Sequence, residues 1–462
     1  MTSRAFAMAQ TMAVAGLMGV GAASTAQAQI APVDIPASYG IGTQATTIQG
    51  WVANNQQDQI RAHGWTIWSG LNAPSGQTYN GAALPVWETW LGTEEAFATT
   101  SNASVLNADK KTAKAPARHF VKPHQFGHLA ALTGKAVKNA AADTQVVSFN
   151  KFSPSAASFI AAPQTIAGLS GTYSINTTAG LTALNGAWPS SVPTTNRSIN
   201  DFPVDAAELK PVFGVVAQKG MTPMPLWQGP KQATNATNPT PDTWKTCVAV
   251  DPAGSGGIVP VAQSKLTSAQ VTALNAQAKQ AGLACTIGYY APLTVLYNFQ
   301  MSAGEAAAMQ AAQGPKASAG DFAVLLAMHV NTKEIPFWTW QTFYWQPGPD
   351  TPNKFPGSKA DAPSSLPAPF NNYAMCTSYS QTVPVNSSTM ALCFNPYLET
   401  SSGIPAGITS NCVSCHALAG VGTGPTYPAN YKAPINLFAN KSYFTNASTR
   451  TDFSWAVASP PN

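Results

Sequence analysis

Apolar runs of a few residues, rich in β-branched and aromatic side chains, recur through the middle of the chain. Such runs are typical of β-strands when glycine, proline and small polar residues bound them. They recur between Val146 and Trp345. The predicted strands cover residues 146–149, 172–175, 212–216, 246–250, 285–299 and 322–330.

Three other stretches carry signals of α-helices. In residues 56–69, Ile60, Ile67 and Trp68 fall on one helical face. Two more helices are predicted to begin at capping boxes, in which Ser or Thr precedes Gln or Glu by three positions. They cover residues 267–282 and 302–314, each with a glycine as its stop. Strands and helices together predict an α+β fold.

Loop-forming residues are abundant and suggest how the chain divides. It has 35 glycines and 37 prolines in 462 residues, so much of it is expected to be turn and loop. A chain of this length usually builds more than one hydrophobic core. Prolines cluster in residues 346–369, which we predict to be a linker. It would separate an α+β body, residues 29–345, from a C-terminal segment, residues 370–462.

The first residues have the pattern of a secretory signal peptide. Arg4 is followed by small and apolar residues and then by Ala26-Gln27-Ala28. A positive charge, a short apolar region and an A-x-A site predict cleavage after Ala28. No later apolar stretch has the length needed to span a membrane. The sequence therefore predicts a signal peptide at residues 1–28 and an exported mature chain without a membrane span.

Charge narrows the classes of partner. Only 9% of the residues are charged, and the formal net charge is +5. A field this weak does not favour binding to nucleic acid or to an anionic membrane. The charge therefore favours neither of these two classes of partner.

Four of the six cysteines are candidates for disulfides. Cys247, Cys285, Cys376 and Cys393 lie apart from the last two cysteines, and export favours their oxidation. Four cysteines allow three pairings. We favour pairs of sequence neighbours, Cys247–Cys285 and Cys376–Cys393, and the alternative is that some stay buried thiols.

Residues 412–416 read Cys-Val-Ser-Cys-His. The pattern Cys-x-x-Cys-His is the attachment signature of c-type haem. The thiols of Cys412 and Cys415 add to the two vinyl groups of the porphyrin, and the two-residue gap on a helical turn lets both reach. His416 then supplies an imidazole nitrogen to the iron. The motif predicts one covalently bound haem c, and with the signal peptide it indicates the periplasm.

Two other chemistries use a Cys-x-x-Cys pair. A structural zinc site needs a second pair of ligands, and the neighbouring sequence contains none. A redox dithiol is expected to open a helix after a strand, without a fixed histidine behind it. Both describe this sequence less well than haem attachment does.

The residues after the motif resemble the cytochrome c family. A glycine-rich turn, Gly420-Val-Gly-Thr-Gly-Pro425, follows the haem histidine, as it does in many members. The resemblance implies a helical haem-bearing segment. It also implies that the carbonyl of Pro425 accepts the Nδ1–H of His416 and fixes the ring.

A wider resemblance involves aromatic clusters. Residues 329–345 contain six aromatic side chains and His329, and tryptophans recur in residues 87–90 and 451–455. With the single haem motif, these features resemble a family of large exported bacterial monohaem proteins without an assigned activity. The aromatic stretch is interpreted either as the wall of a porphyrin or substrate pocket or as a strand packing alternate rings into the core.

The second axial ligand of the iron must come from upstream. No methionine or histidine follows His416, unlike the arrangement in small cytochromes c. His329 is our first candidate, because a ring on an apolar strand requires a polar partner. Alternatively, His329 bonds a backbone carbonyl, and a methionine or nothing binds the iron. The other candidates are Met328, Met375, Met390 and the more remote His63.

The primary functional prediction is a periplasmic monohaem cytochrome that transfers single electrons. The expected partners are redox partner proteins or, for an enzyme, a small-molecule substrate. The alternative is a haem enzyme, peroxidase-like or another oxidoreductase, whose sixth iron position is open or weakly held. The large size favours this alternative, although no sequence signal shows a distal acid–base pair. A third reading is a haem-based sensor of a gas or of redox state. The sequence is compatible with all three.

Overall fold

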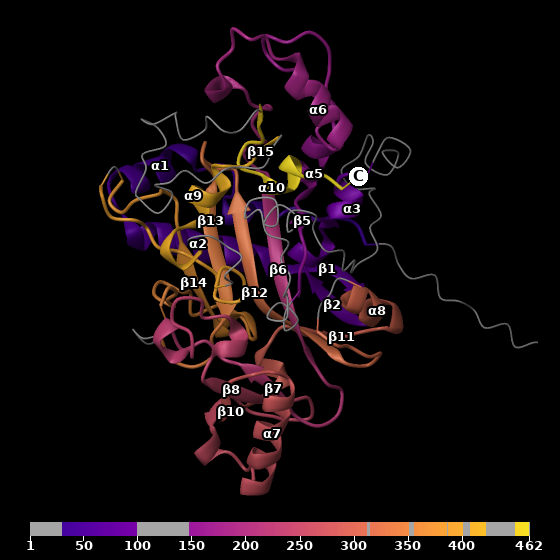
Figure 1. The fold of residues 1–462 in the computed structure, drawn as a ribbon, viewed down its shortest axis with the longest axis vertical. Helices are drawn as coiled ribbons and strands as arrows, with labels where there is room; N and C mark the ends of the chain where they lie inside the picture. Colours follow the sequence, from indigo (N-terminus) through magenta and orange to yellow (C-terminus); the bar gives the residue numbers. More distant parts are fainter. Residues whose placement is uncertain are drawn as a thin grey trace, which may run out of the picture.

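A computed structural model describes residues 30–98, 147–311, 315–350, 355–385, 387–400, 407–421 and 449–461 (Figure 1). The predicted signal peptide, Gly314 and Pro425 lie outside these residues.

The largest element of the described residues is an antiparallel sheet of eight strands. Its order is β14-β13-β12-β6-β5-β3, with β11 paired to β12 and β4 paired to β6. The strands are β3 (Leu91–Gly92), β4 (Val147–Ser148), β5 (Lys151–Phe152), β6 (Ala207–Val216), β11 (Asn298–Gln300), β12 (Phe322–Thr332), β13 (Thr339–Trp345) and β14 (Tyr373–Thr377).

A smaller mixed sheet of order β7-β8-β10-β9 lies at the lower end of Figure 1. Its strands are β7 (Thr222–Pro225), β8 (Thr246–Asp251), β9 (Val259–Pro260) and β10 (Thr286–Pro292). Helix α7 (Ser268–Gln280) buries Leu274 and Ala278 against β8 and β10, in a core that includes Cys247 and Cys285.

The remaining strands are short, and the remaining helices range from four to fifteen residues. Two pairs of strands form separate ribbons, β1 (Pro74–Tyr79) with β2 (Ala82–Pro85) and β15 (Gly420–Val421) with β16 (Thr449–Arg450). The helices are α1 (Ala45–Ala53), α2 (Gln57–Leu71), α3 (Thr93–Ala96), α5 (Pro154–Ala161), α6 (Thr178–Ala187), α8 (Ala303–Ala311), α9 (Cys412–His416) and α10 (Trp455–Ala458).

Helix α2 covers one face of the large sheet (Figure 1). The Trp68 ring stacks on Phe343, with ring centroids 4.2 Å apart, and Trp65 contacts the same ring. A side chain on Gly64 would collide with Met375, so this glycine allows the helix to approach β14 closely. Met328, directly opposite Phe343 in the register, faces the same way.

The opposite face of the sheet is covered by the C-terminal part of the chain. Side chains alternate along a strand, so Trp340 points away from Phe343 and from α2. The ring of Trp340 lies against His416 of α9. The central sheet therefore separates α2 from the Cys-x-x-Cys-His helix, which Figure 1 shows in yellow in front of β13.

The α+β prediction is confirmed, and most predicted elements are present. Helix α2 matches the amphipathic stretch, and Thr267 and Gln270 form the predicted capping box of α7. The prediction of one strand over residues 285–299 is wrong, because Pro292 ends β10 and a 3₁₀ turn precedes β11. The strand predicted at residues 172–175 is also absent, and Tyr173 makes only an isolated bridge with Gln164.

The aromatic stretch of residues 329–345 forms a hairpin rather than a single strand. Its residues complete β12, turn through residues 333–338 and form β13. All seven residues of β13 are buried, so its aromatic rings are distributed over both covered faces of the sheet.

The predicted linker, residues 346–369, lies between two adjacent strands of one sheet. Strand β14, from the predicted C-terminal segment, pairs with β13 of the predicted body. In the described part of residues 370–462 the α-helices are α9 and α10, of five and four residues. The likeness of this segment to cytochrome c stays a prediction.

Both predicted disulfides are present. Cys247 pairs with Cys285, and Cys376 pairs with Cys393. Cys412 and Cys415 belong to neither bond. Among the described residues, no helix is both long and apolar enough to cross a membrane.

The Cys376–Cys393 disulfide closes a loop with a sequence separation of 17 residues. A cross-link of this span restricts the unfolded chain and contributes about 3 kcal/mol. We therefore expect replacement of both cysteines with serine to lower the free energy of unfolding by about that amount, measured by chemical denaturation. The reduced wild type should be less stable than the unreduced variant. Reduction breaks both disulfides of the wild type, whereas the unreduced variant still has Cys247–Cys285. An unchanged unfolding curve in the variant would contradict this role.

Candidate functional site

Helix α9 presents both motif cysteines on one turn. Asn411 caps it, because its Oδ1 accepts the amide of Ser414 at 2.9 Å. The Nδ2 of Asn411 also donates to the carbonyl of Gln381 at 2.9 Å, which anchors the cap to the body. Val413 is buried, whereas Cys412, Cys415 and His416 are half-buried. The helix therefore packs by one side and leaves the reactive side chains accessible on another.

The imidazole of His416 is fixed by two contacts. Its Nδ1 lies 2.8 Å from the carbonyl oxygen of Phe453, and its ring centroid lies 4.3 Å from that of Trp340. A carbonyl can only accept, so Nδ1 carries the hydrogen and Nε2 carries the lone pair. Burial lowers the pKa of His416 to about 3, with the charges of His329 and Lys210 acting in the same direction. His416 is therefore neutral and has the tautomer that binds a metal through Nε2.

The carbonyl of Phe453, which follows β16, accepts the Nδ1–H of His416. Pro425 lies outside the described residues, so the hydrogen bond expected of its carbonyl stays a prediction. No sequence motif marks the Phe453 carbonyl as an acceptor, because any residue has a carbonyl and only the chain path brings this one to the ring.

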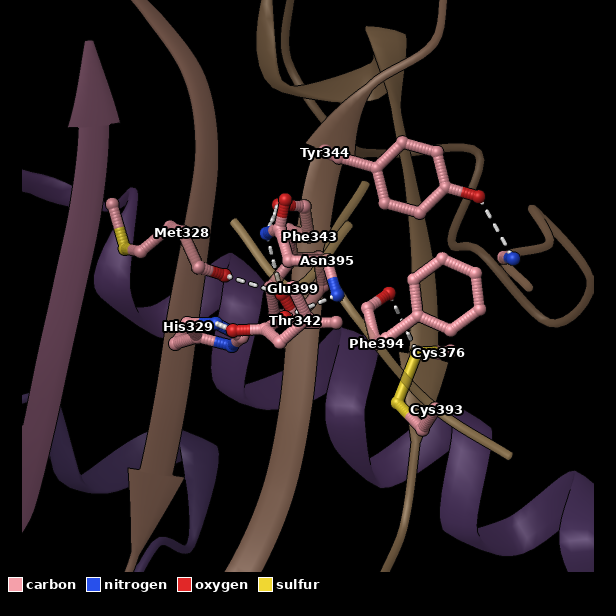
Figure 2. The surroundings of a disulfide bond; sticks show 11 residues. Met328, His329, Thr342, Phe343, Tyr344, Cys376, Cys393, Phe394, Asn395 and Glu399 are labelled. Carbon is pink, nitrogen blue, oxygen red and sulfur yellow. Dashed lines mark hydrogen bonds and ion pairs between the residues drawn. A yellow bond between two sulfur atoms is a disulfide. The ribbon is translucent and has the colours of Figure 1, made fainter. Parts of the chain in front are cut away.

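A polar row crosses the sheet on the face that carries α9. Lys210, His329 and Thr342 are direct neighbours in the register of β6, β12 and β13. Figure 2 shows Glu399 beside His329, and the carboxylate Oε1 lies 2.7 Å from His329 Nε2. The Nδ2 of Asn395 donates to Thr342 Oγ1 at 2.7 Å.

The cluster of Lys210, His329 and Glu399 lies close enough to α9 to influence its ionisation. Burial raises the pKa of Cys412, and the charge of Glu399 raises it further. Burial lowers the pKa of Lys210 to about 8, although Glu399 and Cys415 oppose that shift. Burial also raises the pKa of Glu399, but His329, the amide of Asn395 and Lys210 together outweigh it and leave that pKa lowered. The side chains of His329 and Glu399 keep 18% and 23% of their surface exposed.

The upstream candidates for the second iron ligand lie in different parts of the structure. Met328 and Met375 belong to the side of the sheet covered by α2, so the sheet separates them from His416. His63 of α2 lies 2.7 Å from the Tyr379 hydroxyl and 3.4 Å from the Glu334 carboxylate, and no contact with α9 is among its interactions in the described residues. His329 lies on the same face as His416 and finds its polar partner in Glu399 rather than in a backbone carbonyl. The sulfur of Met390 lies 3.1 Å from Nδ2 of Asn411, the residue that caps α9. Iron ligation by His329 stays a prediction.

Sequence reasoning did not identify Lys210, Glu399 or Phe453 as site residues. Lys210 left a usable signal, since it is a charged residue within the otherwise largely apolar strand β6. Glu399 lies in an irregular segment and left none. Trp340 belongs to the aromatic stretch, but nothing in the sequence around it indicates its contact with His416.

Within the part of the chain that the structure describes, no group of three or more His, Cys, Asp and Glu side chains is arranged to hold an ion. Haem attachment requires only two thiols and one imidazole from this region, and α9 provides all three.

Comparison of the chain with protein-family models, curated proteins and solved structures finds no match.

A buried carboxylate holds α10 next to the site. Ser454 caps α10, and its hydroxyl donates to Oε1 of Glu208 at 2.6 Å. Burial raises the pKa of Glu208 to about 7, although hydrogen bonds from Ser454 and Asn331 oppose the shift. The folded chain therefore binds this proton more tightly than the unfolded chain does.

A raised pKa at Glu208 predicts a pH-dependent difference between the wild type and Glu208→Gln. The contribution of proton uptake to stability is complete below the ordinary glutamate pKa and is lost as the pH rises through about 7. The free energy of unfolding of the wild type, relative to the variant, should fall by on the order of 3 kcal/mol between pH 4 and pH 8. Urea unfolding at several pH values measures this difference. If the free energies of unfolding of the wild type and the variant changed equally with pH, the prediction would be contradicted.

Proposed function

We propose that Cys412 and Cys415 attach one haem c through thioether bonds and that His416 binds its iron through Nε2. The protein would then be an exported monohaem cytochrome of the periplasm that passes single electrons between redox partners. The observation that carries this proposal is the arrangement on α9, where two thiols outside the disulfides and one neutral imidazole occupy a single helical turn.

The described residues fit the group. Haem, when bound, supplies a couple that gains and loses one electron at its iron. Cys412 and Cys415, being half-buried, are accessible for addition to the vinyl groups. Trp340 lies against the His416 ring, while the Phe453 carbonyl holds its proton at Nδ1. Such a hydrogen bond orients the ring and increases the basicity of the nitrogen that binds the metal.

The two thioether bonds predict which cysteines hold the haem. When the protein is expressed with its export signal in a cell that assembles cytochromes c, we expect haem to remain on the wild-type chain after acid–acetone extraction. The Cys412→Ala/Cys415→Ala variant should lose it, because no thiol is left to form the bonds. Haem staining of a denaturing gel and mass spectrometry measure the outcome.

The matched control replaces Cys376 and Cys393 with serine. It also removes two cysteines, from the part of the chain that precedes the motif. That variant should keep covalent haem. Covalent haem on the Cys412→Ala/Cys415→Ala variant, or a wild type without haem, would overturn the proposal.

A second candidate function is a haem oxidoreductase that acts on peroxide or a small organic substrate. The observation that favours it is the His329–Glu399 pair with Lys210 beside it, on the face of the sheet that carries His416. A histidine hydrogen-bonded to a carboxylate can take up or deliver a proton, which peroxide chemistry requires. The partial exposure of both side chains would let that proton exchange with water.

Variants of His329 and Glu399 separate the two functions. If His329 is the second axial ligand of an electron carrier, His329→Ala changes a low-spin spectrum to high-spin and lets carbon monoxide bind. Glu399→Gln then keeps the low-spin state. If the pair serves an oxidoreductase, the wild type is already high-spin, and both variants slow its reaction with peroxide by about 100-fold or more. A low-spin wild-type spectrum that survives His329→Ala would contradict both roles for this residue.

A further inference from the structure

The carbonyl that fixes His416 belongs to an unusual backbone turn. Asp452 and Phe453 have φ angles of 47° and 69°, in the left-handed region that residues other than glycine seldom adopt. Asparagine and aspartate tolerate this region better than most residues, whereas phenylalanine does not. The turn must therefore be held by contacts outside its own backbone.

The contacts that hold it converge on the carboxylate of Asp452. Its Oδ1 lies 2.6 Å from Lys333 Nζ, and its Oδ2 accepts the amide of Phe202 at 2.8 Å. The side chains of Asp452 and Lys333 keep only 4% and 5% of their surface exposed. Both oxygens are engaged and shielded from water, so small displacements of this carboxylate are opposed from two sides.

Lys333 is also held in place by several contacts. It opens the turn between β12 and β13, and its Nζ also donates to the carbonyl of Pro336 at 3.1 Å. It lies over the ring of Trp338, with the nitrogen 5.9 Å from the centroid. A second carboxylate, Asp201, lies 3.6 Å away but is largely exposed. Asp452 is therefore the buried partner of this cation.

The same hairpin contacts the His416 ring directly. Trp340 follows the turn on β13 and lies against the ring. The β12–β13 hairpin thus fixes His416 twice, at its face through Trp340 and at Nδ1 through Lys333, Asp452 and the Phe453 carbonyl.

We propose that the Lys333–Asp452 ion pair is a positioning device that holds the Phe453 carbonyl on His416 Nδ1 and thereby lowers the reduction potential of the attached haem. This inference rests on the haem attachment proposed above. A firmly held acceptor makes the imidazole a stronger donor, which favours the more positively charged ferric iron. A loosened acceptor weakens that preference.

The test replaces Asp452 with asparagine. Asparagine accepts the left-handed conformation and keeps an oxygen for the amide of Phe202, so Asp452→Asn removes mainly the charge that faces Lys333. We expect covalent haem to be retained and the midpoint potential to rise above that of the wild type. The matched control is Asp201→Asn, which removes the exposed carboxylate near the same lysine and should keep the wild-type potential. Equal potentials in all three proteins would overturn the proposal.

A second measurement needs neither redox chemistry nor a stable Asp452 variant. In the full-length Cys412→Ala/Cys415→Ala chain, nitrogen NMR of labelled histidines should show His416 protonated at Nδ1, with that hydrogen exchanging slowly with water. Adding Lys333→Met should speed the exchange. Exchange as fast as that of an exposed imidazole in the parent chain would overturn the positioning role.

The two proposals fail in different ways. A wild type without covalent haem refutes haem attachment but leaves the NMR result to decide the positioning role. Covalent haem with an unchanged potential in Asp452→Asn refutes only the positioning role.

Discussion

The antiparallel register of β6, β12 and β13 is the constraint on which the rest of the structure depends. Because residues directly opposite one another share a face, this register gathers Lys210, His329 and Thr342 into one row. It places Met328 and Phe343 together on the other face, where α2 buries them. A shift of one residue would turn the polar row into the apolar core under α2.

Long-range contacts then hold the C-terminal part of the chain on the polar face. The Cys376–Cys393 disulfide ties the segment that carries Asn395 and Glu399 to the edge strand β14. Glu208 of β6 holds the cap of α10, and Lys333 holds the turn before it. The residues after 390 that the structure describes contain only short helices and strands, so these links with the sheet determine where α9 lies.

The chemistry available at α9 follows from this placement. Burial and nearby charge keep His416 neutral, and a carbonyl from a distant part of the chain selects its tautomer. The His329–Glu399 pair supplies a proton-exchanging group on the same face. Electron transfer needs only the neutral His416 imidazole as an iron ligand. Catalysis on a substrate would also use the His329–Glu399 pair, and this pair is the observation that favours an enzymatic role.

The sequence by itself determined the local features: the α+β class, helix α2, the capped start of α7 and the three motif residues of α9. Each depends on side chains near one another in the chain. The sequence favoured the two disulfide pairings, and the tertiary structure selected them from the three that four cysteines allow. The tertiary structure decided the rest. Phe453 acts through a backbone carbonyl, which carries no sequence signature, and Glu399 becomes a partner of His329 only because a disulfide and a strand register bring together residues 70 positions apart. Pairings of this kind are determined by packing across the whole sheet, and local patterns in the chain do not encode them.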